Sequence, residues 1–447
     1  MTHCAPPRTL PRDLSTALRF YNLLLPLAFV LMLPGLLRRM LRRGNYRENF
    51  GQRFGRYGES ERERFGEGRW VWIHSISVGE TLVALKLARA LREQDPGVCV
   101  ALSVTTSTGF ALARQQGLAW VEVLYNPVDF PGMVGRALDL IRPERLIFIE
   151  GETWPNLVAE AARRGIGMAL VNARMSPRSE ARFRRRVRWV APLFGQLDWV
   201  CVAEVEDVAL WRGLGARPEV VRHTGSLKFD LGIGHSGESG RLRGILESVG
   251  VEAGAPVLVA GSTWAPEERV LAGVLLRLRG RFPKLFLVLV PRHVERTSEL
   301  ARELEGLGLR VARRSMLGQR QGAPCDVLLV DTTGELRSWY EVGEVAFVGK
   351  SLPGVGEAGG QNPAEPAALS RPVVFGPHME NFGPVVGRLL AGEGAVQVVD
   401  AAGLEEVLGW LLGDAGARER IGARAGRALE PHQGAAQRCA SLLLGRE

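Results

Sequence analysis

The sequence has few cysteines and few histidines, and they are not clustered. The five cysteines, an odd number, lie far apart in a chain of 447 residues: Cys4, Cys99, Cys201, Cys325 and Cys439. Disulfide frameworks are typical of short chains with an even set of cysteines, so this pattern favours a reducing compartment. No Cys/His spacing of the zinc-site type occurs. We therefore expect no disulfide framework, no metal and no other cofactor.

Neither of two widespread phosphate-binding motifs occurs in its usual position. No G-x-x-x-x-G-K-[ST] loop is present, and no G-x-G-x-x-G follows the first predicted strand of a domain. These absences argue against a Walker-type site and a standard dinucleotide-binding domain. Arginine, by contrast, is abundant, and the net charge is +9. Such a charge favours anionic partners: phospholipid, phosphorylated sugar or nucleic acid.

Only one long apolar segment without charge is present, Phe20–Leu37. A helix of about 18 residues reaches roughly 27 Å, which barely matches a bilayer core. An arginine cluster follows, as expected for a cytoplasmic flank: Arg38, Arg39, Arg42 and Arg43. A cleaved signal peptide, a spanning anchor and an interfacial helix remain open, but the arginines in place of a cleavage site favour an anchor. We expect the polar residues 1–18 to be irregular.

From residue 69 onward, apolar strands alternate with amphipathic helices. This pattern predicts parallel sheets with helices on both faces, an α/β fold. The length and the 46% share of hydrophobic residues allow two such domains. The expected order is a polar extension and membrane anchor (1–44), a first Rossmann-like domain (45–225), an interdomain linker (226–254), and a second Rossmann-like domain with closing helices (255–447).

A glycine-rich loop lies between two predicted strands in the stretch Val345–Phe382. Gly359 and Gly360 leave backbone N–H groups unshielded, so the loop can hold a phosphate. Asn362 suits an N-cap, and Glu365 in the first helical turn is placed to accept hydrogen bonds from ribose hydroxyls. An ordinary loop of an α/β domain accounts for the same pattern.

A second motif, Trp72–Glu80 (WIHSISVGE), takes a strand into a helix. It places Glu80 at the carboxyl end of the first sheet strand, where ligands bind in such sheets. A carboxylate there can take a proton from an attacking hydroxyl. Position alone, however, favours a glutamate that only complements the helix dipole.

Taken together, the motifs resemble the 3-deoxy-D-manno-octulosonic acid (Kdo) transferases, GT-B-fold glycosyltransferases that attach Kdo to lipid A. The similar segments follow one another in the family's order: Glu48–Gly55, Trp72–Glu80, Phe148–Asn156, Asn172–Ser179, Gly225–Asp230, Gly261–Trp264, Pro291–Arg296, Asp331–Leu336 and Gly359–Phe382. Lys350 departs from the family, which usually has glycine there. The resemblance implies two Rossmann-like domains facing a cleft, with an N-terminal membrane-anchor helix.

The resemblance also implies roles for single residues. Glu80 would be the general base, and the acceptor would be bound by Ser77, Glu152, Asn172 and Arg174. Fixed cations would stabilise the departing nucleotide phosphate without a metal. The residues that would bind the donor are Lys228, Ser262, Thr263, Arg292, His293, Gly334, Glu335, Gly359, Gly360, Asn362 and Glu365.

The implied reaction is an inverting transfer of Kdo from CMP-Kdo to a lipid A precursor in lipopolysaccharide core biosynthesis. It would take place at the inner (plasma) membrane, with the catalytic domains on the cytoplasmic side. The run Arg182–Arg188 would contact lipid phosphates or the anionic leaflet. No nucleic-acid partner is expected, because no recognised motif accompanies the charge. A GT-B enzyme using another sugar nucleotide, and an inactive membrane-tethered binding homologue, remain alternatives.

Overall fold

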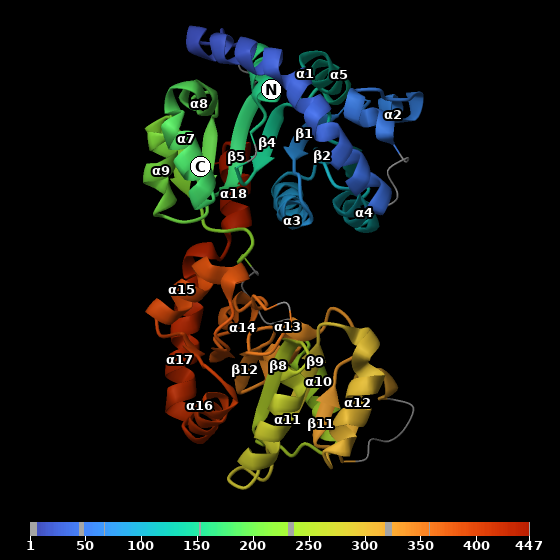
Figure 1. Ribbon diagram of the computed structural model, residues 1–447, viewed down its shortest axis with the longest axis vertical. Helices are drawn as coiled ribbons and strands as arrows, with labels where there is room; N and C mark the ends of the chain where they lie inside the picture. Colours follow the sequence, from blue (N-terminus) through green and yellow to red (C-terminus); the bar gives the residue numbers. More distant parts are fainter. Residues whose placement is uncertain are drawn as a thin grey trace. The chain divides into compact units, whose positions relative to one another are not determined.

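The structure is a computed structural model that describes residues 7–43, 49–66, 68–151, 153–230, 237–317, 324–356 and 358–446. The chain forms two compact units: Met1–Asp230 together with Gly434–Glu447, and Leu231–Gln433. Within the described ranges, each unit contains a seven-stranded parallel sheet flanked by helices (Figure 1). The predicted α/β class with two Rossmann-like parallel-sheet domains is confirmed.

The sheet of the first unit has the order β3-β2-β1-β4-β5-β6-β7. Trp70 and Trp72 of β1 pack into one apolar core, while Val71 and Ile73 pack into the other. Side chains alternate across a strand, so both faces of β1 are buried and its four central residues are apolar. The strands are β1 (Arg69–His74), β2 (Val98–Val104), β3 (Val121–Tyr125), β4 (Arg145–Ile149), β5 (Gly167–Ala173), β6 (Trp199–Val202) and β7 (Val221–His223).

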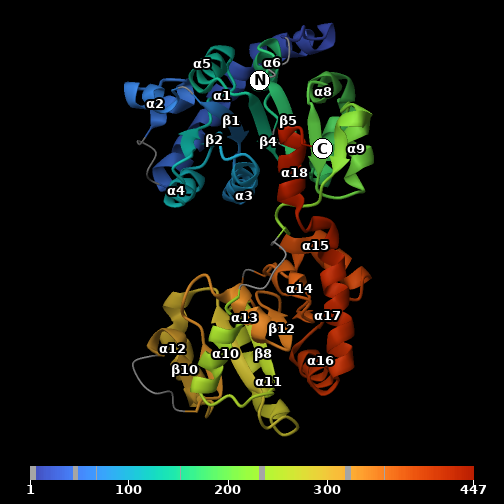
Figure 2. The ribbon, with the colours of Figure 1, turned by 180° about the vertical axis from the view of Figure 1, so that it is seen from behind.

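Helices cover both faces of this sheet, as Figures 1 and 2 show from opposite sides. The core on one face includes residues of α3 (Val78–Gln94), α4 (Ser107–Gln115) and α18 (Ala435–Leu444). The core on the other includes residues of α1 (Arg12–Arg43), α5 (Pro131–Ile141), α6 (Pro155–Arg163), α8 (Val187–Phe194) and α9 (Asp207–Gly213). Shorter or more peripheral elements are η1 (Phe50–Phe54), α2 (Glu59–Arg64), α7 (Pro177–Arg185) and η2 (Pro218–Val220).

The N-terminal helix begins earlier than we expected. Residues 1–18 were predicted to be irregular, but α1 starts at Arg12, and Leu14 and Leu18 are buried in the core of the first unit. The two leucines are four residues apart and therefore share one helix face, which gives the helix an apolar stripe. The first two turns of α1 thus pack against the core, and the predicted boundary at residue 44 does not separate an anchor from the first domain.

The same helix runs from one end of the strands to the other. Arg8, just before α1, pairs with Asp198, which precedes β6, over 2.7 Å. Asn22 exchanges hydrogen bonds of 2.6 and 3.0 Å with Asn156, at the start of α6 beyond β4. The window Arg12–Leu31 has the length and composition of a membrane-crossing helix, and 11% of its residues are buried. Core helices of soluble proteins and signal sequences can have the same length and composition, so these two properties alone do not identify a membrane span.

The second unit repeats the architecture with the strand order β10-β11-β9-β8-β12-β13-β14. Its strands are β8 (Val257–Thr263), β9 (Phe286–Pro291), β10 (Val311–Arg313), β11 (Val327–Leu329), β12 (Val345–Val348), β13 (Val373–Phe375) and β14 (Ala395–Gln397). Its α-helices are α10 (Ser239–Ser248), α11 (Glu267–Leu278), α12 (Thr297–Gly306), α13 (Leu336–Val342), α14 (Ala364–Ala368), α15 (Gly383–Ala391), α16 (Ala401–Gly413) and α17 (Ala415–Leu429). The alternation of apolar strands with helices that the sequence pattern predicted is present here too.

The borders between the units differ from the predicted ones. Leu227, which we placed in a linker, is fully buried in the first unit, and its N–H donates to Asn172 Oδ1 over 2.9 Å. Residues of the expected linker also form α10, which buries Leu242 in the second unit. Helix α18, expected in the second domain, packs in the core of the first, because Cys439 and Leu443 present an apolar face to α3.

Candidate active site

The strand order of the first unit reverses between β1 and β4, because β2 and β3 lie on one side and β5 to β7 on the other. Open α/β sheets bind ligands outside the carboxyl ends of the strands at such a point. Glu80 lies just beyond the carboxyl end of β1, in the first turn of α3. It therefore occupies the position that the sequence predicted, while its role as a base stays a prediction.

The carboxylate of Glu80 is held in place from two sides. Its Oε1 accepts a hydrogen bond from Ser77 Oγ over 2.9 Å, and its Oε2 accepts from the Ile76 N–H over 2.8 Å. Ser77 is the N-cap of α3, and its Oγ in turn accepts from the Glu80 N–H over 3.2 Å. The Glu80 residue is 8% exposed. Ser77, predicted to touch the acceptor, thus orients Glu80 in this structure.

His74, the last residue of β1, is part of the scaffold of this strand end. Its Nδ1 lies 2.9 Å from Asn126 Oδ1, and the rings of Phe148 and Trp154 meet it edge-on. Burial lowers the pKa of His74 to about 3, so the imidazole is uncharged near neutral pH. A fully buried neutral imidazole fits a supporting role better than proton transfer.

A carboxylate beyond β4 links two of the predicted site residues. Arg174 Nε lies 2.9 Å from Glu150 Oε2, and Lys228 Nζ lies 2.6 Å from Glu150 Oε1. The lysine contact is an ion pair without the geometry of a hydrogen bond. Arg174, predicted for the acceptor, and Lys228, predicted for the donor, therefore share one carboxylate in the first unit. Glu152, the other predicted carboxylate of this loop, lies outside the described residues.

Asn172 is placed differently from a residue that touches an acceptor. It is fully buried, and its Oδ1 accepts hydrogen bonds from the Leu227 N–H and from Ser226 Oγ, the latter over 3.3 Å. These contacts attach the segment after β7 to the end of β5. Asn172 thus holds the segment that carries Lys228, and an acceptor could reach it only after a rearrangement.

The strand order of the second unit reverses between β8 and β12. One carboxylate joins the loops that follow these two strands. Glu267, in the first turn of α11, is fully buried and accepts hydrogen bonds from the N–H groups of Trp264, Lys350, Ser351 and Leu352, over 2.7 to 3.0 Å. Burial raises the pKa of Glu267, although these N–H groups act in the opposite direction. Because three of its four partners are backbone groups on the loop after β12, sequence spacing could not single it out.

Several predicted donor residues lie on these loops. Ser262 and Thr263 end β8, and the Arg292 N–H donates to Thr263 O over 3.0 Å. Arg292 and His293 follow β9 and are exposed. The His293 ring meets Trp264 edge-on, with centroids 4.6 Å apart. The structure therefore brings the predicted residues of β8 and β9 together at one edge of the sheet.

Backbone strain is found at the same strand ends. Glu150, Asn172, Ser262 and Lys350 have φ angles of 64°, 55°, 53° and 61°. Residues other than glycine rarely adopt this left-handed conformation, and such residues cluster at functional sites. The left-handed backbone gives a reason for the glycine that the family usually has at Lys350. Here the lysine is kept, and its Nζ lies 4.5 Å from the centre of the Trp264 ring.

The glycine-rich loop after β12 folds back on itself. A side chain at Gly359 or Gly360 would collide with Asn381 or Met379, and both glycines have positive φ. Helix α14 begins one residue later than predicted, at Ala364, and Asn362 Oδ1 accepts from its N–H over 3.1 Å. The positive φ angles together with these contacts favour glycine at both positions without any bound phosphate.

The carboxylates of Glu365 and Glu335 differ in how many partners hold them and in the direction of their pKa shifts. Burial raises the pKa of Glu365. A hydrogen bond from Asn362 and the charges of Arg337 and Arg292 act in the opposite direction. Glu335 follows Gly334 and accepts from Thr332 Oγ1, Arg314 and Arg241 over 2.5 to 3.2 Å. Burial alone would raise the pKa of Glu335, but these partners together lower it. Glu335 is therefore occupied by structural partners.

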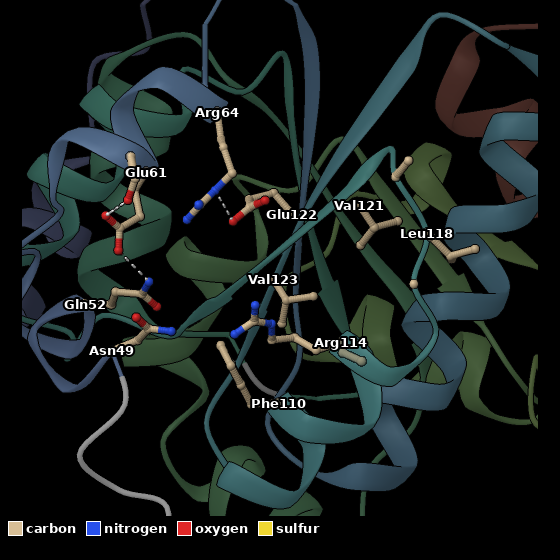
Figure 3. A pocket seen from close by; sticks show the side chains of 14 residues that line it. Asn49, Gln52, Glu61, Arg64, Phe110, Arg114, Leu118, Val121, Glu122 and Val123 are labelled. Carbon is tan, nitrogen blue, oxygen red and sulfur yellow. Dashed lines mark hydrogen bonds and ion pairs between the residues drawn. The ribbon is translucent and has the colours of Figure 1, made fainter.

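Figure 3 shows a cavity on the outer side of β3, which we call the polar cavity. It measures about 450 Å³ and is lined by residues of η1, α2, α4, the loop after α4 and the first half of β3. Arg64 Nε lies 2.8 Å from Glu122 Oε1, and Gln52 donates to Glu61 over 3.2 Å. None of the predicted site residues lines this cavity. In the described part of the chain, no three His, Cys, Asp or Glu side chains come together as metal ligands do.

Comparisons with known proteins identify the family of this chain. Residues 48–231 match the family described as 3-Deoxy-D-manno-octulosonic-acid transferase (kdotransferase). A 3-deoxy-D-manno-octulosonic acid transferase of Bordetella pertussis is 34% identical over 422 residues, which cover 91% of this chain and 94% of the relative. One of Haemophilus influenzae is 30% identical over 401 residues, covering 89% of this chain and 91% of that protein.

A solved structure shares the fold. The UDP-GlcNAc 2-epimerase of Neisseria meningitidis bound to UDP-GlcNAc is 11% identical, with a TM-score of 0.54, and covers 85% of this chain and 100% of that one. At this identity the likeness concerns the GT-B fold alone. The sequence relatives carry the family assignment, because they match along about nine-tenths of the chain. The chain belongs to the 3-deoxy-D-manno-octulosonic acid (Kdo) transferase family and is a glycosyltransferase.

Proposed function

We propose that this protein transfers Kdo from CMP-Kdo to a lipid A precursor, with inversion and with Glu80 as general base. The observation that carries the proposal is the position of Glu80, whose carboxylate lies at the point where the strand order reverses and is oriented by Ser77 Oγ and the Ile76 N–H. A base for glycosyl transfer has to be held in place at a ligand-binding edge.

In the proposed step, a hydroxyl of the acceptor replaces the Ser77 hydroxyl at Glu80 Oε1. As the hydroxyl oxygen forms its bond to the anomeric carbon of Kdo, its proton passes to Glu80. The bond from that carbon to the phosphate oxygen breaks, and CMP leaves with the electron pair. Arg174 and Lys228, paired on Glu150, supply positive charge beside the acceptor.

The donor is proposed to bind at the carboxyl edge of the second sheet. Arg292 and His293 are exposed there, and the charge of Arg292 acts on Glu365. Ser262 and Thr263 would contact the phosphate or the Kdo carboxylate, and Glu365 the ribose. The loop of Gly359, Gly360 and Asn362 would complete the site with Gly334, while Glu335 would act by holding Arg314 and Arg241 in place. No metal enters the proposed step, because arginine and lysine side chains supply the charge that stabilises the leaving phosphate.

The protein is proposed to act at the cytoplasmic side of the inner membrane, held by α1 and by the arginines of α7 and α8. The outward side chains of α1 are apolar and exposed, and Arg182, Arg185, Arg186 and Arg188 are exposed beside them. Basic residues near an anionic leaflet contribute about 1 kcal/mol each. Charge reversal at these arginines should reduce sedimentation with anionic vesicles; unchanged sedimentation would contradict membrane contact through this face.

The experiment that tests the activity uses detergent-solubilised protein with CMP-Kdo generated in situ and a lipid A precursor. The product lipid is weighed by mass spectrometry, and a gain of one or more Kdo masses is expected. Glu80→Gln keeps the size of the side chain and should lose at least about 100-fold in kcat while circular dichroism stays unchanged.

Two other results would count against the proposal. Transfer from another sugar nucleotide, with CMP-Kdo intact, would make the protein a GT-B glycosyltransferase of different donor specificity. Binding of CMP-Kdo without transfer or hydrolysis would make it an inactive membrane-tethered homologue. Near-normal activity of Glu80→Gln would remove Glu80 from the role of base without affecting the choice of donor.

A further inference from the structure

The first unit contains an apolar groove between the N-terminal helix α1 and the helices α7 and α8. It measures about 620 Å³, within the range of roughly 300–1,000 Å³ that is usual for small-ligand sites. Most of its wall is aliphatic or aromatic, with Ala17, Phe20, Leu24, Trp189, Val190 and Leu193 among the lining residues. All of these residues belong to one compact unit. We call it the acyl groove.

The mouth of the acyl groove is apolar as well. Phe20 and Trp189 line it and are 56% and 42% exposed, with their rings in edge-to-face contact at 6.0 Å. Along α1 the exposed surface continues through Leu23, Leu27 and Leu31. Large connected apolar surfaces on a folded protein mark interaction sites. An aliphatic occupant is therefore favoured over a sugar or a nucleotide.

The rim adds positive charge to this apolar wall. Arg182 and Arg186 line the groove. Arg184, which lies between them in sequence, is paired with Glu180 over 2.8 Å, whereas no carboxylate of the described residues forms an ion pair with Arg182 or Arg186. The polar cavity of the same unit differs, because its Arg64 is paired with Glu122 in the wall. An apolar groove with guanidinium groups at its rim matches a phosphorylated lipid, because the groove can hold an acyl chain while the guanidinium binds the phosphate.

The groove also reaches the catalytic edge of the unit. Pro155, one of its lining residues, begins α6 directly after the β4 loop that contains Glu150. A lipid in the groove would thus place its headgroup near the strand ends that carry Glu80 and Glu150. We propose that the acyl groove binds one acyl chain of the phosphorylated lipid acceptor, with Arg182 and Arg186 on a phosphate. This inference rests on the proposed function, and it names how the acceptor is held.

The kinetic test compares two acceptors: the acylated, phosphorylated disaccharide and the same disaccharide without acyl chains. Ala17→Trp fills the groove and should raise KM for the acylated acceptor at least about tenfold, the loss expected when roughly two methylene groups are no longer buried. Turnover of the chain-free acceptor should not change, which also shows that the variant is folded. Ala119→Trp is the matched control, since Ala119 is exposed in the wall of the polar cavity, and both acceptors should behave as with the wild type.

A second variant leaves the apolar wall untouched. Replacing Arg182 and Arg186 by glutamine should raise KM for the phosphorylated acylated acceptor at least about fivefold, since one basic residue near an anionic lipid contributes about that much. The dephosphorylated acylated acceptor should be affected less. Equal losses on the two acceptors would overturn the assignment of a phosphate to these arginines.

A binding measurement is independent of activity. An acceptor with brominated acyl chains should quench the tryptophan fluorescence of the wild type, and Trp189→Phe should lose part of that quenching. An unchanged KM of Ala17→Trp for the acylated acceptor, or equal quenching in Trp189→Phe, would overturn the proposal. Equal quenching by brominated phosphatidylglycerol would assign the groove to bulk lipid and would also overturn it. Quenching at Trp189 without any transfer would support the groove while the proposed function fails.

Discussion

The side chains of Ser77 and Glu80 hold each other at the start of α3. Ser77 Oγ donates to Glu80 Oε1 over 2.9 Å, and it accepts from the Glu80 N–H over 3.2 Å. One serine thus caps the helix and fixes the carboxylate beyond the end of β1. Another helix of the same unit, α4, is capped by Thr106 and has no acidic residue in its first turn, so it provides a control for capping alone.

Ser77→Ala should lose about 1 kcal/mol of stability and also reduce kcat about tenfold, because the Glu80 carboxylate loses one of its two hydrogen-bond donors. Thr106→Ala is the control, since Thr106 caps α4 by accepting from the Gly109 N–H over 3.2 Å. It should lose similar stability with no change in kcat. Denaturant unfolding measures the loss of the cap, and initial rates of the same preparations measure the loss of carboxylate orientation. Equal kcat in both variants would contradict an orienting role of Ser77.

Glu267→Gln should raise KM for the donor about tenfold. An amide has one accepting oxygen where the carboxylate has two. Some of the four N–H groups now bound by Glu267 would therefore lose their acceptor, and each buried N–H without a partner costs about 1–3 kcal/mol of stability. The loops after β8 and β12 would then separate. Glu344→Gln is the control: Glu344 accepts from the Val257 N–H over 2.5 Å at the opposite end of β8, and its loss should lower stability without changing the donor KM.

Asp230→Ala should weaken the attachment of α18 to the first unit. The two oxygens of Asp230 accept from the Gly434 N–H over 3.0 Å and from the Ala436 N–H over 2.7 Å. Amide hydrogen exchange should become faster in α18 and α3, which pack together, and stay unchanged in the second unit. Asp414→Ala, which removes the cap of α17 in the second unit, should show the opposite distribution. Faster exchange confined to the second unit in Asp230→Ala would contradict the observed packing.

The pH dependence of stability should contain a contribution from His74. Burial lowers the pKa of His74 from 6.5 to about 3, so the unfolded chain takes up a proton that the folded protein does not. This contribution is fully present above pH 6.5 and is lost as the pH falls toward 3, by about 1.4 kcal/mol per pH unit. His74→Gln should remove this slope in urea unfolding measured between pH 6.5 and 4. Parallel curves for the wild type and the variant would contradict the buried neutral imidazole.

Asp129 should make the stability of the protein fall as the pH rises, the opposite of the effect of His74. Burial raises the pKa of Asp129 from 3.8 to about 7, although the N–H groups of Asn156 and Leu157 and the Tyr21 hydroxyl oppose this shift. The contribution is fully present below pH 3.8 and is lost as the pH rises through 7. Asp129→Asn should therefore be less destabilising at pH 7 than at pH 4, relative to the wild type. The same loss at both pH values would show that the carboxyl group is ionised in the folded protein.

Much of the fold could be predicted from local pattern. Strand β12 was predicted over the residues that form it, Val345–Val348, because a strand buried on both faces has to be apolar at every position. Glu80 could be placed for a similar reason, since only the short segment Ser75-Ile76-Ser77 separates the strand from the helix. The first turn of α1 was missed, because its apolar stripe has only two buried leucines among polar neighbours.

The structure places the predicted site residues that it describes, whereas their roles stay predictions. Arg174 and Lys228 were assigned to different substrates, and the structure places both on Glu150. Asn172 was assigned to the acceptor, and it proved to be buried against the segment after β7. Family motifs identify which residues recur, but they do not say which of them contact each other.

The sequence by itself determined the two parallel-sheet units, the strand ends where ligands bind, and the residues available there. These features depend on neighbours along the chain, because periodicity, capping and strand length are local properties. Only the tertiary structure decided that α18 returns to the first unit, that Glu267 joins two loops, and that α1 forms a groove with α7 and α8. Each of these depends on groups far apart in sequence, whose buried polar and apolar surfaces find partners only when the chain folds.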